Sequence, residues 1–440
     1  MKITTSGSEI LRTFSPQIEH TSMREKVWIT LLLIAIGFAG YGLYLQIAYG
    51  HGVTGMRNNV VWGIYIVNFV FLIGLSYAGA IIAGFLVLFK VQWGKPLIRL
   101  AQLMTLASVI VGPIFILLCV GRFDRLHHLF IYPRLQSPLT WDVLAVLTFL
   151  IGSFIFLYLE ILPDLAVYRD SNLKVSKWKH NLYGWLAIGY RATESQKKRL
   201  ITSQNLMAII LIPLSIMVAS ILSWIFGMTL RPGWHSTIFG PYFVLGALYS
   251  GVGVLIVITW YTRKFYHLEK YITPRHFDYL AYIMLVLAAG YGYFTFSEYF
   301  TSWYGSEKWD NELITKLFSW HEYGWLTFFA NMAGVVLPII FVAFRKLRKP
   351  DSLAVVAMIM VLAMWVKRYL IVVPTLETPL LPVQDIRPEY VHYTITWVEW
   401  MMTFGGVASF FLIFTLAGKF ITLIDISEVP QEENIKIQNQ

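Results

Sequence analysis

Ionisable side chains inside long apolar stretches are the residues of this sequence best placed to do chemistry. Charged groups are costly in hydrocarbon, so those found there commonly handle protons, ions or substrates. Asp142, Glu298 and Glu399 lie near one end of their apolar runs, and Asp164 lies near the opposite end. Carboxylates at both depths could relay protons between a buried site and one face, although each could equally be an interfacial anchor or half of an ion pair. The relay candidates are Glu298, Glu399, Asp164 and Arg368.

Histidine and cysteine restrict the redox chemistry that the chain itself could perform. All ten histidines fall in loops or at the ends of apolar runs. A bis-histidine haem needs imidazoles on facing helices at matching depth, so an integral cytochrome b is not expected. The single cysteine, Cys119, cannot hold an iron–sulfur cluster, which normally takes about four thiolates. We expect no haem, no iron–sulfur cluster and no metal site in this chain, and any redox centre must belong to a partner.

The elements that carry these side chains are membrane-spanning helices. The chain has 440 residues, of which 57% are hydrophobic and only 14% charged, which excludes a soluble protein. A helix needs roughly 20 apolar residues to cross the hydrocarbon core, and backbone amides there must be satisfied internally. We therefore expect an all-α integral membrane protein. Its ten spans are predicted near 27–48, 61–89, 99–121, 139–160, 201–227, 237–260, 277–300, 322–344, 352–373 and 393–424.

Basic residues predict the orientation of these spans. With ten spans, the two termini and four of the loops share one side, and these segments hold 25 Lys and Arg residues against eight on the other side. The positive-inside rule then places both termini in the cytoplasm and the protein in the cell (inner) membrane. The asymmetry also accounts for the net charge of +10, so no nucleic-acid partner is expected.

A weak internal echo predicts how the spans are grouped. Gly63, Tyr65 and Gly74 recur 177 residues later as glycine, tyrosine and glycine at 240, 242 and 251. Parallel repeats of this kind predict two four-helix bundles, spans two to five (61–227) and six to nine (237–373), with spans one and ten peripheral. The transmembrane domain would cover 27–425, between a cytoplasmic segment at 1–26 and a cytoplasmic tail at 426–440.

Several segments resemble the polysulfide reductase NrfD family, and the likeness covers nearly the whole chain. The closest match is to its ten-helix branch, which includes the ActC subunit of alternative complex III. The segments that carry the resemblance are WGIYIVNFVFLIGLSYAGA (62–80), GRFDRLHHLFIYPRLQSPLTWDV (121–143), LPDLAVYRD (162–170), PGWHSTIFGPYFVLGALYSG (232–251), SWYG (302–305), MWVKRYLIVV (364–373) and YTITWVEW (393–400).

The resemblance implies a quinol site and a redox partner. Such proteins bind menaquinol or ubiquinol near the outer face of one bundle, hold no cofactor of their own, and pass electrons to an extracytoplasmic iron–sulfur subunit. Further candidate partners are a molybdopterin or cytochrome c subunit and a second NrfD-like subunit. The protein itself would be embedded in the lipid bilayer. Asp142 matches the acid of the family's Ser-Pro-Leu-x-Trp-Asp motif, and Arg122 the arginine of its Gly-Arg pair. Asp142 would accept the quinol proton, and Arg122 would orient the quinol.

The sequence departs from the family pattern at several of these positions. The family's His-Leu-Gly-Arg reads Cys-Val-Gly-Arg here, so Cys119 stands where a quinol-binding histidine is usual. Its His-Ala-Gly motif in span two begins with Tyr77, the acid before the span-nine arginine is Lys367, and an expected His and Asp in span five are also missing. Either other polar residues substitute, or this member has lost its quinone site. The predicted quinone-binding residues are His127, His128, Tyr132, Asp142, Arg122, Tyr77 and Cys119.

The sequence thus predicts a membrane subunit that exchanges electrons and protons between the quinone pool and an extracytoplasmic partner, with proton translocation as an additional possibility. One rival is a membrane anchor that docks soluble redox subunits without a quinone site of its own. Another is a solute transporter, which would require broken helices and charges at mid-depth, and few of either are present.

Overall fold

The computed structural model describes residues 18–425 except 20, 122, 172–174, 230 and 379–391. Within these residues the secondary structure is helical, and ten segments are long and apolar enough to cross a membrane, so the predicted fold class and number of spans are confirmed. The spans are α2 (Met23–Tyr49), α3 (Gly63–Leu88), α4 (Lys95–Cys119), α6 (Pro138–Asp170), α8 (Glu194–Gly227), α9 (Phe239–Phe265), α10 (Pro274–Gly305), α12 (Gly324–Asn331) with α13 (Leu337–Ala343), α14 (Pro350–Leu376) and α16 (Trp397–Phe420).

Local sequence determines where the helices begin. Ser22 and Thr193 form capping boxes with the residues three positions later, which satisfy amide groups that a helix start leaves free. Pro138 is the first residue of α6, where its missing amide proton costs nothing. Because of the Thr193 box, α8 starts seven residues before the predicted span and carries a polar first turn. α6 likewise continues ten residues past its predicted end, to Asp170.

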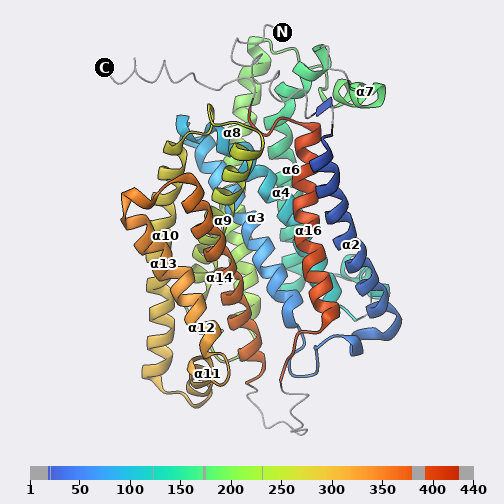
Figure 1. The fold of residues 1–440 in the computed structure, drawn as a ribbon. Coiled ribbons are helices and arrows are strands. Elements are labelled where there is room, and N and C mark those ends of the chain that lie inside the picture. The colour runs from blue at the N-terminus through green and yellow to red at the C-terminus, as the bar shows by residue number, and fades with distance from the viewer. Residues whose placement is uncertain are drawn as a thin grey trace.

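The helices group into two bundles joined side by side (Figure 1). In the first bundle α3 packs against α4 and α8, and α6 against α4 and α8. In the second, α9 packs against α10 and α14, and the α12–α13 span packs between α10 and α14. α2 and α16 pack on each other, and α16 rests on α4 at the side of the first bundle. Two four-helix bundles with two peripheral helices are therefore present.

Small residues bring the two bundles into close contact. Gly74 of α3 faces Ala247 of α9, and a β-carbon on Gly251 would lie only 2.2 Å from that of Ala78. Small residues let transmembrane helices approach closely in this way. Gly74 and Gly251 are the last pair of the internal echo, so this pair lies at the boundary between the bundles.

Among the described residues, three short α-helices lie outside the spans, and two of them mark the opposite ends of the molecule. α7 (Lys177–Leu186) lies at one end, and α11 (Lys308–Phe318) lies at the other (Figure 1). α5 (His128–Ile131) lies in the loop between α4 and α6. We refer to the α7 end, which the basic residues predict to be cytoplasmic, and to the α11 end.

The eighth span contains a π-helical turn at Met332–Val336, between α12 and α13. The Tyr249 hydroxyl of α9 donates a hydrogen bond of 2.6 Å to the Gly334 carbonyl within this turn. Wide turns of this kind disturb the regular hydrogen-bond ladder. The tyrosine supplies a partner to the affected backbone, as hydrocarbon surroundings require.

Candidate functional site

Asp142 and Tyr77 bring two unsatisfied polar groups together inside the first bundle. Asp142 lies in the second turn of α6 and is 5% exposed, and its Oδ1 atom is buried with no hydrogen-bond partner among the described residues. The Tyr77 hydroxyl of α3 is buried and equally without a partner there, and it lies within electrostatic range of the Asp142 carboxyl. Leaving such groups unpaired is costly. The pair can therefore receive hydrogen bonds from water or from a bound ligand.

Aromatic packing fixes the position of Tyr77. Its ring packs edge-to-face with Phe149, seven residues beyond Asp142 along α6, with the ring centroids 5.1 Å apart. Tyr77 is thus held against α6 on the side of the helix that also carries Asp142. The Asp142 carboxyl could take up a proton, and the Tyr77 hydroxyl could donate or accept a hydrogen bond.

The predicted loop residues lie elsewhere. His127, His128 and Tyr132 are exposed, with Tyr132 71% exposed, and their rings pack on one another at centroid distances of 4.4 and 5.6 Å. Arg122 lies outside the described residues. The loop residues are close to Asp142 in the chain, whereas its neighbour within the bundle is Tyr77 from another helix. A role of the loop residues in quinone binding stays a prediction.

Cys119 occupies a half-buried position at the end of α4. Its thiol lies 3.7 Å from the Trp62 carbonyl and 3.6 Å from the Phe115 carbonyl, so it is a weak donor to backbone oxygens. Gly121 just beyond it faces the His51 ring. His51, from the segment between α2 and α3, is therefore the histidine that the fold brings to this helix end.

Glu399 is a fully satisfied carboxylate. It accepts hydrogen bonds from the Tyr393 hydroxyl at 2.7 Å, from the Thr396 amide at 2.9 Å and from the Gly55 amide at 2.9 Å. Its side chain is completely buried. These bonds cap α16 and attach the segment between α2 and α3 to it, so they support a structural anchor more than a proton relay.

Asp164 is paired with a buried cation at the α7 end of the first bundle. Arg99 Nη1 lies 2.5 Å from Asp164 Oδ2 and also donates to the Thr422 and Ile424 carbonyls, at 2.9 and 3.0 Å. The ion pair therefore joins α4, α6 and the segment after α16. The sequence did not predict the pairing of Arg99 with Asp164, although a charge at the first residue of the predicted span 99–121 was a signal for a buried partner.

The second bundle holds a different set of charges at the α11 end. Glu298 of α10 accepts a 2.7 Å hydrogen bond from Ser236, and its Oε1 atom is buried without a partner among the described residues. Lys367 of α14 is buried and donates to the Tyr299 hydroxyl. Arg368 is also buried, with its guanidinium 4.9 Å from the centre of the Phe243 ring. Two cations therefore share this region with Glu298.

Glu298 and Lys367 line a small cavity of about 50 Å³ together with Tyr242, Thr295 and Tyr299. At about 10–15 Å³ per molecule, such a space has room for a few waters. It is too small for a quinone ring. Of the predicted relay candidates, Glu298 lines this cavity with Lys367, and Arg368 is the residue next to Lys367 on α14.

Comparison with known proteins identifies the family. The model of the family described as polysulphide reductase, NrfD, matches residues 52–379, which include all of α3 to α14. The chain belongs to the NrfD family. Both four-helix bundles lie within the matched region, whereas the peripheral helices α2 and α16 lie outside it.

Relatives of this NrfD protein are similar to it over different lengths. A putative dimethyl sulfoxide reductase membrane subunit from Halobacterium salinarum is 30% identical over 60% of this chain and 56% of its own length. A selenate reductase subunit from Mesobacillus selenatarsenatis is 21% identical over 54% of this chain and 56% of its own length. An Hdr-like menaquinol oxidoreductase integral membrane subunit from Archaeoglobus fulgidus is 22% identical over 92% of this chain and 96% of its own length. The matched region thus spans just over half of the first two relatives and nearly all of the third.

Proposed function

We propose that this NrfD protein is the membrane subunit of a respiratory oxidoreductase complex. It exchanges electrons and protons between the menaquinone or ubiquinone pool and an extracytoplasmic iron–sulfur partner. The quinone would bind in the first bundle, beside Asp142 and Tyr77. We also propose a molybdopterin or cytochrome c subunit and a second NrfD-like subunit as partners.

The observation that carries this proposal is the pair of unsatisfied groups in the first bundle. The Asp142 Oδ1 atom and the Tyr77 hydroxyl are both buried, both without hydrogen-bond partners among the described residues, and contributed by two helices. A quinone headgroup offers an oxygen at each end that can accept a hydrogen bond, or donate one when reduced. Ring oxygens of this kind would satisfy both protein groups at once.

The chemistry follows from the two protonation states of the ligand. When a quinol becomes a quinone, it releases two protons and two electrons. Asp142 would accept the proton of one hydroxyl, the second proton would pass to water, and Tyr77 would orient the ring by a hydrogen bond to its oxygen. The single cysteine of the chain cannot ligate a cluster, so the electrons would pass one at a time to the iron–sulfur centre of the partner.

A line of polar groups supports a proton path as a further part of the proposal. On α6, Asp142, Ser153 and Asp164 are spaced by 11 residues, close to three helical turns, so they share one face. The Ser153 hydroxyl is buried without a partner among the described residues. On the neighbouring α4, Ser108 and Gln102 are likewise buried and unpartnered. Waters bridging these groups would connect Asp142 toward Asp164 and the α7 end.

Relatives and charge placement support the setting. The relatives are named as subunits of a dimethyl sulfoxide reductase, a selenate reductase and a menaquinol oxidoreductase. The excess of Lys and Arg at the α7 end favours a cytoplasmic location for that end. In this orientation Asp142 lies near the extracytoplasmic face of the cell membrane, on the side where the partner would receive electrons.

A binding titration tests the proposal. The protein is purified with its partner subunits and titrated with a fluorescent quinone-site inhibitor, whose fluorescence falls on binding. We expect saturable quenching for the parent. Asp142→Asn and Tyr77→Phe should each weaken it at least tenfold, since each removes one of the two groups that face the ligand.

Glu298→Gln is the matched control, because Glu298 is also a partly buried carboxylate at the α11 end but belongs to the second bundle. It should bind the inhibitor like the parent. Absence of saturable binding in the parent would overturn the quinone role and favour the anchor. Equal weakening by Glu298→Gln would move the site away from Asp142.

A further inference from the structure

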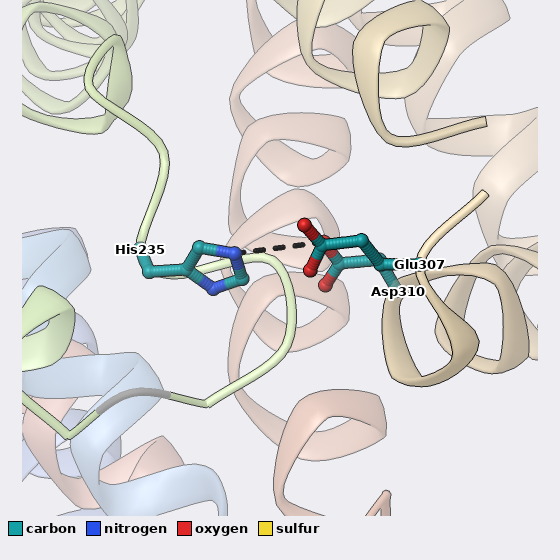
Figure 2. Close-up of side chains that lie close together, drawn as sticks. All are labelled: His235, Glu307 and Asp310. Carbon is teal, nitrogen blue, oxygen red and sulfur yellow. Dashed lines mark ion pairs between the residues drawn. The ribbon is translucent and has the colours of Figure 1, made fainter. Parts of the chain in front are cut away.

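Three side chains with metal-ligating groups converge at the α11 end of the second bundle. We propose that His235, Glu307 and Asp310 form a binding site for a divalent metal ion. His235 comes from the segment between α8 and α9, whereas the two acids come from the start of α11. Figure 2 shows the imidazole ring directed at both carboxylates from the opposite side.

The distances suit a small metal ion. The candidate ligand atoms of the three residues all lie within 4.8 Å of one another, and His235 Nε2 is 3.6 Å from Asp310 Oδ2. Ligand bonds to zinc are about 2.0–2.2 Å long, which places two ligand atoms of a tetrahedral site about 3.4 Å apart. The His235–Asp310 pair is therefore already close to that spacing. Glu307 is exposed and can close the remaining gap by rotating its side chain.

The hydrogen bond on the far side of the imidazole makes Nε2 a ligand atom. His235 Nδ1 lies 3.2 Å from the Arg231 carbonyl oxygen. A carbonyl can only accept, so Nδ1 carries the proton, and in the neutral ring Nε2 presents a lone pair to two carboxylates. Lone pairs facing one another are unfavourable unless a proton or a cation lies between them. Ligating histidines are commonly oriented by such a bond to a backbone carbonyl.

Asp310 is also held in place from behind. Its Oδ1 accepts a 3.1 Å hydrogen bond from the Gly233 amide, which leaves Oδ2 directed toward His235. The residue is only 9% exposed. The adjacent Lys308 does not neutralise the two carboxylates, because its ammonium group lies over the Trp309 ring, 4.7 Å from the ring centre. Two carboxylates with a neutral imidazole carry a charge of −2, which a divalent ion neutralises.

The donor set indicates the class of metal. One imidazole nitrogen and two carboxylate oxygens suit zinc and similar first-row divalent ions, with water completing the coordination. The ion would join the segment between α8 and α9 to α11, and both Gly233 and Asp310 also line the cavity that contains Glu298. The bound ion would therefore hold together two segments that line that cavity, and it would have no redox role.

Cobalt and zinc titrations test the proposal on the full-length protein. The protein is purified through a tag without histidines, stripped with a chelator and titrated with Co²⁺ while its visible absorption is recorded. Zn²⁺ binding is then measured by calorimetry. We expect one saturable site, with ligand-field bands for Co²⁺ and a higher unfolding temperature with Zn²⁺.

His235→Ala and Glu307→Gln should each weaken binding at least tenfold, and both residues are exposed, so the fold should survive the changes. The matched controls are His321→Ala and Glu312→Gln, which remove an exposed histidine and an exposed acid from the same region. They should bind like the parent. Absence of saturable binding, or binding that persists in His235→Ala, would overturn the site and leave an ordinary ion pair between His235 and Asp310.

Discussion

The two four-helix bundles place different sets of charged groups on similar scaffolds. In the first bundle, Asp142 and Tyr77 are buried with unsatisfied atoms, and no ion pair joins Asp142 to a cation among the described residues. In the second bundle, Lys367 and Arg368 accompany two acids, Glu298 and Asp310. Counting formal charges gives −1 for the first set, and two cations with two carboxylates give 0 for the second.

This difference separates two kinds of chemistry. An acid and a phenol without a paired cation can take a proton from a ligand and hydrogen-bond its ring oxygens. Cations beside an acid stabilise its charged form and so offset the cost of burying it. The same architecture thus offers a proton acceptor in one bundle and a charge-balanced cavity in the other.

The largest expected effect concerns the paired charges at the other end of the first bundle. Arg99→Leu should lower the free energy of unfolding by about 3–5 kcal/mol, because it leaves Asp164 as an unpaired buried charge. Asp142→Asn should change stability far less, since Asp142 has no ion-pair partner to lose among the described residues. Unfolding in mixed micelles with increasing SDS measures both. Equal destabilisation by the two changes would contradict the distinction between a paired and a free carboxylate.

A smaller effect is expected for the satisfied carboxylate of α16. Glu399→Gln removes the charge from several hydrogen bonds and should cost about 1.5–3 kcal/mol, the usual worth of a hydrogen bond to a charged group. The same SDS titration would detect it. Glu312→Gln, an exposed acid on α11, serves as the control and should leave stability unchanged. A stable Glu399→Gln protein would remove the reason for treating Glu399 as an anchor.

The contact between the bundles can be tested with Gly251→Val. The new side chain would overlap Ala78 across the boundary, and overpacking of this kind costs about 1–3 kcal/mol. Gly37→Ala is a suitable control, because a β-carbon there meets nothing within 4 Å and α2 lies at the periphery. If Gly251→Val is as stable as the control, the two bundles are not held at a fixed close distance.

The smallest effect is expected in the second bundle. Lys367→Met should leave the affinity for the quinone-site inhibitor within about twofold of the parent, because Lys367 belongs to the second bundle and the proposed site lies in the first. A twofold change corresponds to about 0.4 kcal/mol. The fluorescence titration used for Asp142→Asn measures it. A large loss of affinity would mean that both bundles contribute to one ligand site, and the contrast between them would then fail.

The number of spans could be predicted from the sequence because the thickness of the hydrocarbon core sets the length of each apolar run. Each span needs a long apolar run, and that requirement is visible without any tertiary information. Ten runs were therefore enough to obtain ten helices. The ends were less accurate: the Thr193 capping box extends α8 beyond the apolar run, and apolar content alone does not detect it.

The site was only partly predictable. Asp142 and Tyr77 were both named from their place in family motifs, but their closeness depends on how α3 and α6 are rotated, which the sequence does not state. Arg99 was missed as the partner of Asp164, because the two residues come from different helices. His235 and Asp310 were missed for the same reason, as side chains from separate segments meet only after folding.

The π-helical turn in the eighth span changes how this span aligns, residue by residue, with a regular α-helix. Such a turn holds one residue more than the α-helical turn it replaces, so the span contains an insertion that its length alone conceals. Deleting one residue within the turn would restore a regular α-helix and leave α12 and α13 in their present relative orientation. Gly334, which now faces Ala363 of α14, lies within this turn. Aligning this span with a regular helix therefore requires a gap of one residue at Met332–Val336.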